Sequence, residues 1–169
     1  PVRAAELTLI CEVPTLQRFL GRLVFSADSE SATEAVDQII GNLGKLNAAA
    51  REHLLQGILD GIDGRRSISP PSSWSKVRPS LFESTDRIKM LSLQLATRFG
   101  DPDAMQELRT ILDDADREPN IRKEALEQLL AVDDSVIVGR LKDYFRDPVL
   151  GPLAIRKYGS FPDLSLIHI

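Results

Sequence analysis

Residues that carry redox, covalent and metal chemistry are scarce in this chain. The single cysteine, Cys11, excludes an intramolecular disulfide and any metal site built from several cysteines. Covalent attachment of a c-type haem needs two thiols followed by a histidine, so that route is excluded as well. The two histidines are His53 and His168, and neither stands in a metal-ligand motif. We therefore expect no metal and no cofactor, and we expect Cys11 to be a buried structural thiol.

Other scarcities narrow the class of partner. The net charge is −4 and the pI is about 5.2, so no overall positive field attracts nucleic acid. No apolar run reaches the roughly 18 residues of a membrane span. With 169 residues, 43% of them hydrophobic and 5% aromatic, the chain can bury a core as one domain or a short repeat array. We expect a monomer that contacts protein, without nucleic-acid binding or membrane insertion.

Motifs for catalysis are missing too. The chain has no G-x-S-x-G nucleophile motif, and Gly57, Gly61 and Gly64 follow helical spacing instead of forming a phosphate loop. The aspartates within 113–116 lack the central glycine and terminal glutamate of a calcium loop, so we interpret them as a solvated turn. No catalytic residue is predicted, and the chain itself is expected not to be an enzyme.

The residues that are abundant follow helical spacing. Leu16, Phe19, Leu20 and Leu23, for example, recur at i, i+3, i+4 and i+7, whereas alternating strand patterns with hairpin turns are missing. The sequence therefore predicts an all-α fold, with helices at 2–11, 14–26, 31–43, 48–62, 73–82, 85–99, 102–114, 119–131, 134–145 and 148–158.

Helix ends carry suitable capping residues. Gly100 suits a left-handed C-terminal position, Asp101 an N-cap and Pro102 the first helical position. The pairs at 133–134 and 147–148 repeat this arrangement.

Similar helices recur along the chain. Arg51, Arg87 and Arg122 are each followed by apolar residues at +3 and +4, and they are separated by 36 and 35 residues. Gly151 takes the place of the arginine 29 residues further on. A period of about 30–36 residues with two short helices per unit is typical of an α-solenoid, in which each helix pair packs on the next.

Segments 99–104 and 120–126 resemble HEAT repeats of the short, lyase-type class. The pattern from Trp74 to Leu126 resembles the HEAT-like segment of large, membrane-associated dehydrogenase-like proteins of planctomycetes and verrucomicrobia, which often carry a c-type haem domain. The resemblance covers 48–163 well and 1–47 loosely. It implies an armadillo-like α-solenoid of about four to five helix pairs, with the haem domain elsewhere in the parent and a periplasmic location.

The ends of the chain suggest a fragment. The helical pattern is already present at residue 2, so we interpret 1–163 as a HEAT-like array cut from a longer, metagenomic reading frame. Residues 164–169 resemble translated adapter read-through, a non-native tail; the alternative is a genuine short apolar segment. His168 is accordingly given no role.

The repeated arginines have two interpretations. The resemblance to HEAT-like repeats implies that Arg51, Arg87 and Arg122, together with Asp101, stabilise the seams between repeats, with the arginines bonding carbonyls or a turn aspartate. The alternative is a row of guanidinium groups lining a concave anion-binding surface, which the acidic composition disfavours.

The least repetitive segment is the insertion at 63–73, which leads into the only tryptophan. Arg65, Arg66 and Trp74 are our candidates for contacting a partner. The alternative is a plain connector in which Ser72 or Ser73 caps a helix and Trp74 anchors it.

These features favour a non-catalytic scaffold or protein-interaction module, and the resemblance implies that it is part of a larger dehydrogenase-like, haem-associated protein. Its partners would be another protein or neighbouring domains of the parent. Two alternatives are a HEAT-like chromophore lyase, which would need an apolar groove, and a DNA-repair glycosylase, which would need a basic face with aromatic residues.

Overall fold

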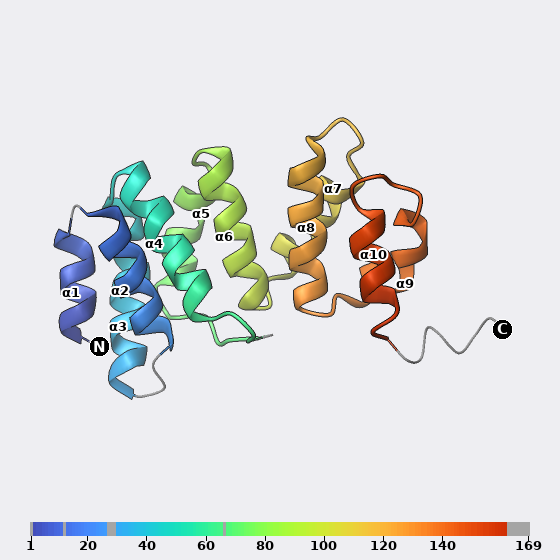
Figure 1. Ribbon diagram of the computed structural model, residues 1–169. Helices are drawn as coiled ribbons and strands as arrows, with labels where there is room; N and C mark the ends of the chain where they lie inside the picture. Colours follow the sequence, from blue (N-terminus) through green and yellow to red (C-terminus); the bar gives the residue numbers. More distant parts are fainter. Residues whose placement is uncertain (1, 12, 27–29, 66, 162–169) are drawn as a thin grey trace. The chain divides into compact units, whose positions relative to one another are not determined.

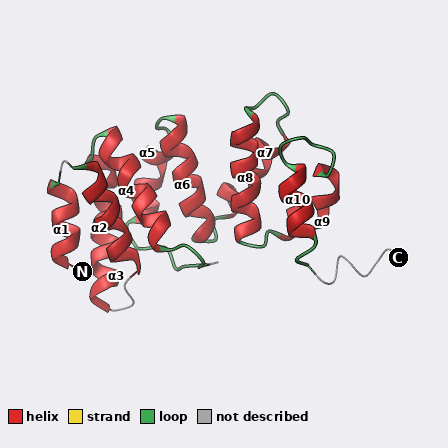
Figure 2. Ribbon diagram, viewed as in Figure 1, coloured by secondary structure: helices red, strands yellow, loops and turns green. Residues whose placement is uncertain are grey.

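A computed structural model describes residues 2–11, 13–26, 30–65 and 67–161. Over these ranges the chain is helical, with ten α-helices, two short 3₁₀ helices and no strand (Figures 1 and 2). The predicted all-α fold is therefore confirmed. Within the same ranges, no helix is both long enough and apolar enough to cross a membrane. Arg66 and the predicted tail 164–169, with His168, lie outside the described residues.

The chain divides into two compact units, Pro1–Gly100 and Asp101–Ile169. In the first unit the described helices are α1 (Val2–Ile10), α2 (Pro14–Ser26), α3 (Glu30–Asn42), η1 (Leu43–Lys45), α4 (Ala48–Gly61), α5 (Trp74–Phe82) and α6 (Asp86–Arg98). Helix α1 packs on α3 and α3 on α5, while α2 packs on α4 and α4 on α6. Helix α1 also packs on α2, and α5 on α6. Consecutive helices therefore alternate between two sets, α1, α3 and α5 in one and α2, α4 and α6 in the other (Figure 1).

Glycine allows α2 and α4 to approach closely. A Cβ atom added at Gly57 would lie 2.2 Å from the carbonyl oxygen of Arg18, and one at Gly61 would lie 2.7 Å from that of Arg22. Real Cβ atoms do not come so near backbone, so only glycine fits at these two positions. Their helical spacing, which excluded a phosphate loop, thus has a packing explanation.

Aliphatic side chains fill the space between the helices of the first unit. Its fully buried large side chains include Ile39, Ile40, Leu43, Leu54, Leu55, Ile58, Leu81 and Leu91. Few aromatic rings are needed because branched aliphatic side chains pack these short helices.

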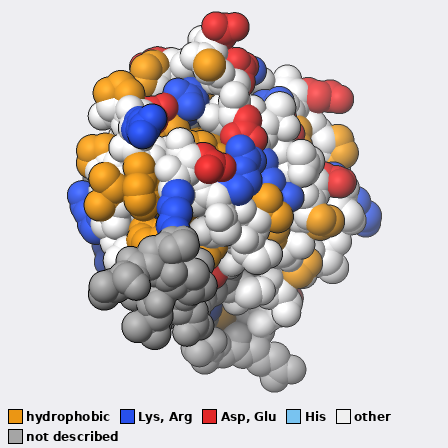
Figure 3. Space-filling model, turned by 90° about the vertical axis from the view of Figure 1, so that its right-hand side faces the viewer, with side chains coloured by type: hydrophobic (Ala, Val, Ile, Leu, Met, Phe, Trp, Pro, Cys, Tyr) orange, Lys and Arg blue, Asp and Glu red, His pale blue; other side chains and the backbone are white. Residues whose placement is uncertain are grey.

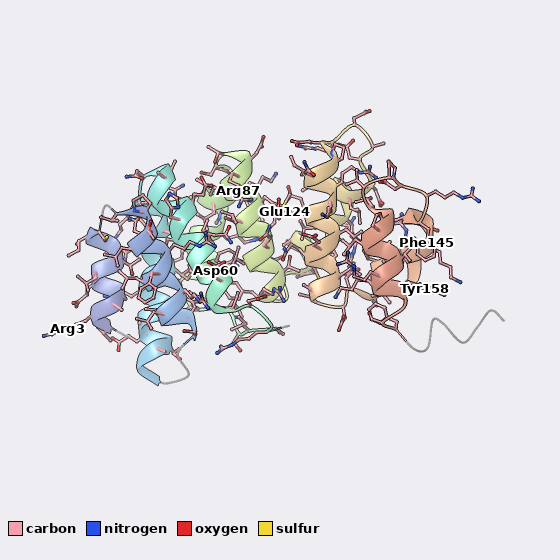
Figure 4. The ribbon with its side chains drawn as sticks, in the orientation of Figure 1. Arg3, Asp60, Arg87, Glu124, Phe145 and Tyr158 are labelled. Atoms are coloured by element: carbon pink, nitrogen blue, oxygen red, sulfur yellow. The ribbon has the colours of Figure 1, made fainter. Side chains whose placement is uncertain are left out.

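The second unit contains α7 (Pro102–Asp113), α8 (Pro119–Ala131), α9 (Ser135–Arg140), η2 (Leu141–Tyr144) and α10 (Gly151–Tyr158). Helix α7 packs on α8, α8 on α9, and η2 on both α9 and α10. Phe145 and Tyr158 add an edge-to-face ring contact with centroids 5.4 Å apart (Figure 4).

Two predicted helices of this unit differ in extent. The predicted helix 134–145 is α-helical only to Arg140 and then tightens into η2. The predicted helix 148–158 begins as α10 at Gly151. The carboxylate of Asp147 accepts hydrogen bonds from the backbone N–H groups of Val149 and Leu150, which holds residues 148–150 in turns before the helix.

The capping residues predicted at the starts of α7 and α9 behave as expected. Gly100 has a φ of +75°, and the Asp101 carboxylate accepts from the N–H groups of Asp103 and Ala104. Asp134 caps α9 by accepting from the N–H of Ile137, while Asp133 takes the left-handed conformation with a φ of +53°. Asp133 therefore occupies the conformation that Gly100 supplies at the earlier helix end.

Candidate protein-binding surfaces

Large apolar side chains gather on the exposed sides of α1 and α2 and on the turn between them. Six are between 44% and 75% exposed, and we call them the α1–α2 face: Leu7, Ile10, Val13, Leu16, Phe19 and Leu23. Isolated exposed apolar residues are ordinary, but six on two packed helices form a patch of the kind that marks an interaction site.

The orientation of α2 explains this exposure. At 100° per residue, Leu16, Phe19 and Leu23 lie on the side of the helix opposite to buried Gly21 and Phe25. Gly21 faces Leu54 of α4. One side of α2 therefore packs on α4, and its opposite side carries an uncovered apolar stripe.

Helix α1 is arranged in the same way. Its buried residues Ala5 and Thr8 lie opposite exposed Leu7 and Ile10. Arg3 is also exposed and points away from the neighbouring helices (Figure 4). The exposed apolar residues of α1 and α2 thus lie on two helices that pack against each other, on sides that no described helix covers.

An ion pair borders this face where α2 meets α4. Nε of Arg18 donates to Oδ2 of Asp60 at 2.6 Å, and Nε2 of Gln56 donates to the same carboxylate. Burial disfavours the charged form of Asp60, but these hydrogen bonds outweigh it and lower the pKa of the carboxyl. The basic side of α2 is therefore partly neutralised within the first unit.

A hollow adjoins the turn between α1 and α2. It has a volume of about 660 Å³ and is lined by Ile10, Cys11, Gln17 and Lys45, among others. Cys11 is half-buried, less buried than expected, and the N–H of Val13 donates to its Sγ. Cys11 directly follows Ile10, the last residue of α1, and so lies in the turn that leads into α2.

The insertion at 63–73 is held against the helices of the first unit. Nη1 of Arg98 donates to the carbonyl oxygen of Arg65 at 2.8 Å, and the N–H of Ile68 donates to the carbonyl oxygen of Arg98. On the other side, the N–H of Ser73 and the hydroxyl of Ser72 donate to the Asp37 carboxylate. The Ser73 N–H bond is the main reason that the pKa of Asp37 is lowered.

These contacts leave a groove of about 320 Å³ beside the insertion. Its lining is mostly apolar, with one basic residue, and includes Phe25, Val36, Ile62, Arg65, Ile68, Pro70 and Phe99. Of the three candidate contact residues, Arg65 therefore lines a groove. Arg66 is outside the described residues.

Trp74 occupies a different environment. It is only 6% exposed and meets the ring of Phe99 edge to face, with centroids 5.0 Å apart. This is the placement expected of an anchoring residue, and it leaves little of the ring for a partner to contact. Ser73 is the N-cap of α5 without a side-chain cap bond, because its hydroxyl donates to the Asp37 carbonyl oxygen instead.

Arg51 and Arg122 occupy equivalent positions in the two units. Each is the fourth residue of its helix, α4 or α8. Arg51 donates to the carbonyl oxygens of Leu43, Gly44 and Leu46 after α3 and to the Ser84 hydroxyl in the turn before α6.

Arg122 makes a matching set of contacts. It donates to the carbonyl oxygen of Leu112 in α7 and to the carboxylate of Asp147 in the turn before α10. Each arginine thus links the end of the preceding helix to the turn before a later one. Donors used in this way are not free to line an anion-binding surface.

Arg87 does not share this arrangement. It is the second residue of α6 and donates to Oε1 of Gln56, with Glu52 3.5 Å away, so it faces α4 (Figure 4). The fourth residue of α6 is Lys89. The sequence pattern that aligned Arg87 with Arg51 and Arg122 is therefore shifted relative to the helix start.

Two further arginines connect α7 with α9 in ways that the sequence pattern did not indicate. Arg109, itself half-buried, forms an ion pair with the buried Asp134, the residue that caps α9. Arg140 donates two bonds to Asp113, at 3.0 and 3.1 Å, and the Tyr144 hydroxyl donates to the same carboxylate. Asp113, exposed at the end of α7, is thus also an ion-pair partner, which its sequence neighbours did not indicate.

The environment of Tyr144 follows from that contact. Burial, followed by its bond to the charged Asp113, raises the pKa of the Tyr144 hydroxyl to about 12. The hydroxyl therefore remains a hydrogen-bond donor throughout the neutral range. The sequence alone does not predict the ion pair of Arg140 and Asp113, because it does not show that these residues, 27 positions apart, face each other.

Features of a chemical centre are not found in the described part of the chain. There, no three histidine, cysteine or acidic side chains come together as a metal-binding group. The described carboxyls with a clear pKa shift are all shifted downward, opposite to the shift of a general acid: Asp37, Asp60, Asp113 and Asp147. On the face drawn in Figure 3, acidic, basic and hydrophobic side chains are interspersed, and neither charge forms a continuous patch.

Compared with known proteins, the chain matches no family model, no curated protein and no solved structure.

Proposed function

We propose that this chain is a non-catalytic scaffold of the HEAT-like α-solenoid type that binds protein through the α1–α2 face. The observation that carries the proposal is the group of six large apolar side chains that no described helix covers. Burying such a patch against protein removes it from water, the main favourable term in protein association.

The packing of the first unit supports the solenoid part of the proposal. Helices α2, α4 and α6 pack in succession, as do α1, α3 and α5. The matching contacts of Arg51 and Arg122 are what repeated seams between helix pairs would produce. A surface at the end of such a succession is suited to receive a further layer of helix.

We further propose that the parent is a dehydrogenase-like, haem-associated protein in which the module holds neighbouring domains. This step depends on the resemblance of segments 99–104 and 120–126 to short HEAT repeats. The burial of Trp74 does not favour the glycosylase alternative, because the only tryptophan of the chain is unavailable for stacking on a base.

Photo-crosslinking tests the proposed surface. A benzophenone-bearing residue replaces Phe19 on the α1–α2 face or, as a matched control, Ile155, which is similarly exposed in the second unit at 54%. After irradiation in an extract of cells expressing the chain, we expect protein adducts from position 19 well above those from position 155. Equal or no adduct formation at the two positions would contradict the proposal, and the mass of an adduct identifies its second component.

A further inference from the structure

The size of the α1–α2 face is close to what a protein interface requires. Taking about 200 Å² for a fully exposed residue of this size, the six exposed fractions add up to roughly 650 Å² of residue surface, most of it apolar. The largest apolar patch on a monomer is about 300–600 Å², and a stable interface buries about 800 Å² on each partner. The face can therefore supply most of the area for one partner of ordinary size.

The stripe on α2 is complementary to itself. Phe19 lies three residues after Leu16 and four before Leu23, so the three apolar positions are almost symmetric about the middle of the stripe. When two such helices pack antiparallel about a two-fold axis near Phe19, Leu16 of one lies opposite Leu23 of the other. Two-fold interfaces require this property, because the same patch must serve both partners.

Charge does not oppose this pairing. The stripe itself contains no charged residue. Helix α2 has two, Arg18 and Arg22, whose backbone atoms lie against α4 and whose side chains are exposed. Arg18 is already paired with Asp60. The central contact between two copies would consequently be apolar, without an unpaired buried charge.

From this geometry we propose that two copies of the chain pair through antiparallel α2 helices centred on Phe19. The proposal rests on the α1–α2 face being the protein-binding surface and adds the identity of its partner. It differs from the monomer expected from sequence, because periodicity places apolar residues on a helix side without indicating whether another helix covers that side.

The first experiment measures mass. By light scattering or sedimentation, we expect the unaltered chain to approach twice 18.7 kDa as concentration rises. Phe19→Glu places two carboxylates near the two-fold axis and should weaken pairing by on the order of 100-fold or more. The matched control Ile155→Glu should leave the mass unchanged, and Leu23→Glu provides a second test of the face if Phe19→Glu loses its helical circular dichroism.

The second experiment tests the register. In a Cys11→Ser background, Leu16→Cys and Leu23→Cys chains are mixed and oxidised. The antiparallel pair predicts a disulfide between the two variants. Neither variant should crosslink efficiently to itself, because identical positions are offset by seven residues, roughly 10 Å along the helix, whereas a disulfide needs Cα atoms within about 7 Å.

Each outcome separates the pairing from the proposed function. A chain that stays monomeric at all concentrations, or a disulfide that forms preferentially between like variants, overturns the antiparallel pair. If position 19 then crosslinks to a different protein, the proposed function stands and only the self-pairing fails. Loss of both self-association and position-specific crosslinking overturns both.

Discussion

Replacing Gly57 by alanine tests the closest contact between two helices of the first unit. The added Cβ would lie 2.2 Å from the Arg18 carbonyl oxygen and 2.9 Å from its carbonyl carbon and Cα. These are backbone atoms, so α2 and α4 must separate to make room. Overpacking of this kind costs about 3 kcal/mol, while alanine gains about 1 kcal/mol in helix propensity. The free energy of unfolding should therefore fall by about 2 kcal/mol.

Gly139→Ala is the matched control. Gly139 lies in α9, and a Cβ there would meet nothing within 4 Å. Helix propensity then acts alone, and we expect a gain of about 0.5–1 kcal/mol. The same chemical change should thus have opposite signs at the two positions.

Urea unfolding provides the measurement. Trp74, the only tryptophan, is buried in the first unit, so its fluorescence reports the Gly57 variant, while far-ultraviolet circular dichroism follows the Gly139 variant. With a slope of about 2 kcal/mol per molar urea, Gly57→Ala should lower the midpoint by about 1 M. If the Gly57 variant unfolds at the same or a higher urea concentration than the unaltered chain, the close α2–α4 contact is refuted.

Three further predictions concern polar contacts. Arg122→Met should destabilise the second unit by about 1–3 kcal/mol in urea titrations, because the Leu112 carbonyl and Asp147 lose a half-buried donor. Arg87 is exposed, so Arg87→Met should change stability by less than about 0.5 kcal/mol. Equal losses of stability in the two variants would contradict the difference between these arginines. Asp101→Ala should cost about 1 kcal/mol through loss of the α7 cap. A neutral result in urea titrations would argue against the cap. Acid should destabilise the fold, because four carboxyls have a pKa in the folded state below the ordinary 3.8: Asp37, Asp60, Asp113 and Asp147. Such groups contribute stability that is present above pH 3.8 and lost as the pH falls through their folded pKa values. A melting temperature that stays constant or rises as the pH falls below 3.8 would contradict these lowered pKa values.

Local features of the sequence predicted local structure well. Gly100 and Asp101 mark a helix end and a helix start because left-handed backbone and N–H capping depend on adjacent residues. The same reasoning worked at Asp134 but gave too early a start for α10, where Asp147 caps a turn instead. The helices themselves were predictable because apolar spacing follows from helix geometry.

Contacts between distant residues were not predictable in this way. Leu16 and Leu20 carry the same side chain at helical spacing, yet only Leu20 is buried, because coverage depends on which helix packs beside α2. The ion pair of Asp113 was not predicted, because nothing near Asp113 in sequence indicates Arg140. Arg87 matched Arg51 in its flanking apolar residues but differs from it in distance from the helix start, which decides where the guanidinium points.

The two sides of α2 together explain why its exposed stripe suits binding. On one side, Gly57 and Gly61 bring the α2 backbone against α4, and Arg18 is paired with Asp60, so the helix is held by both packing and charge. On the other side, Leu16, Phe19 and Leu23 project from a helix that is already ordered. Because α2 is already folded, a partner that packs there orders only side chains and not the helix backbone. This lowers the entropic cost of association. Disturbing the α4 side should therefore weaken binding even though no residue on that side contacts the partner.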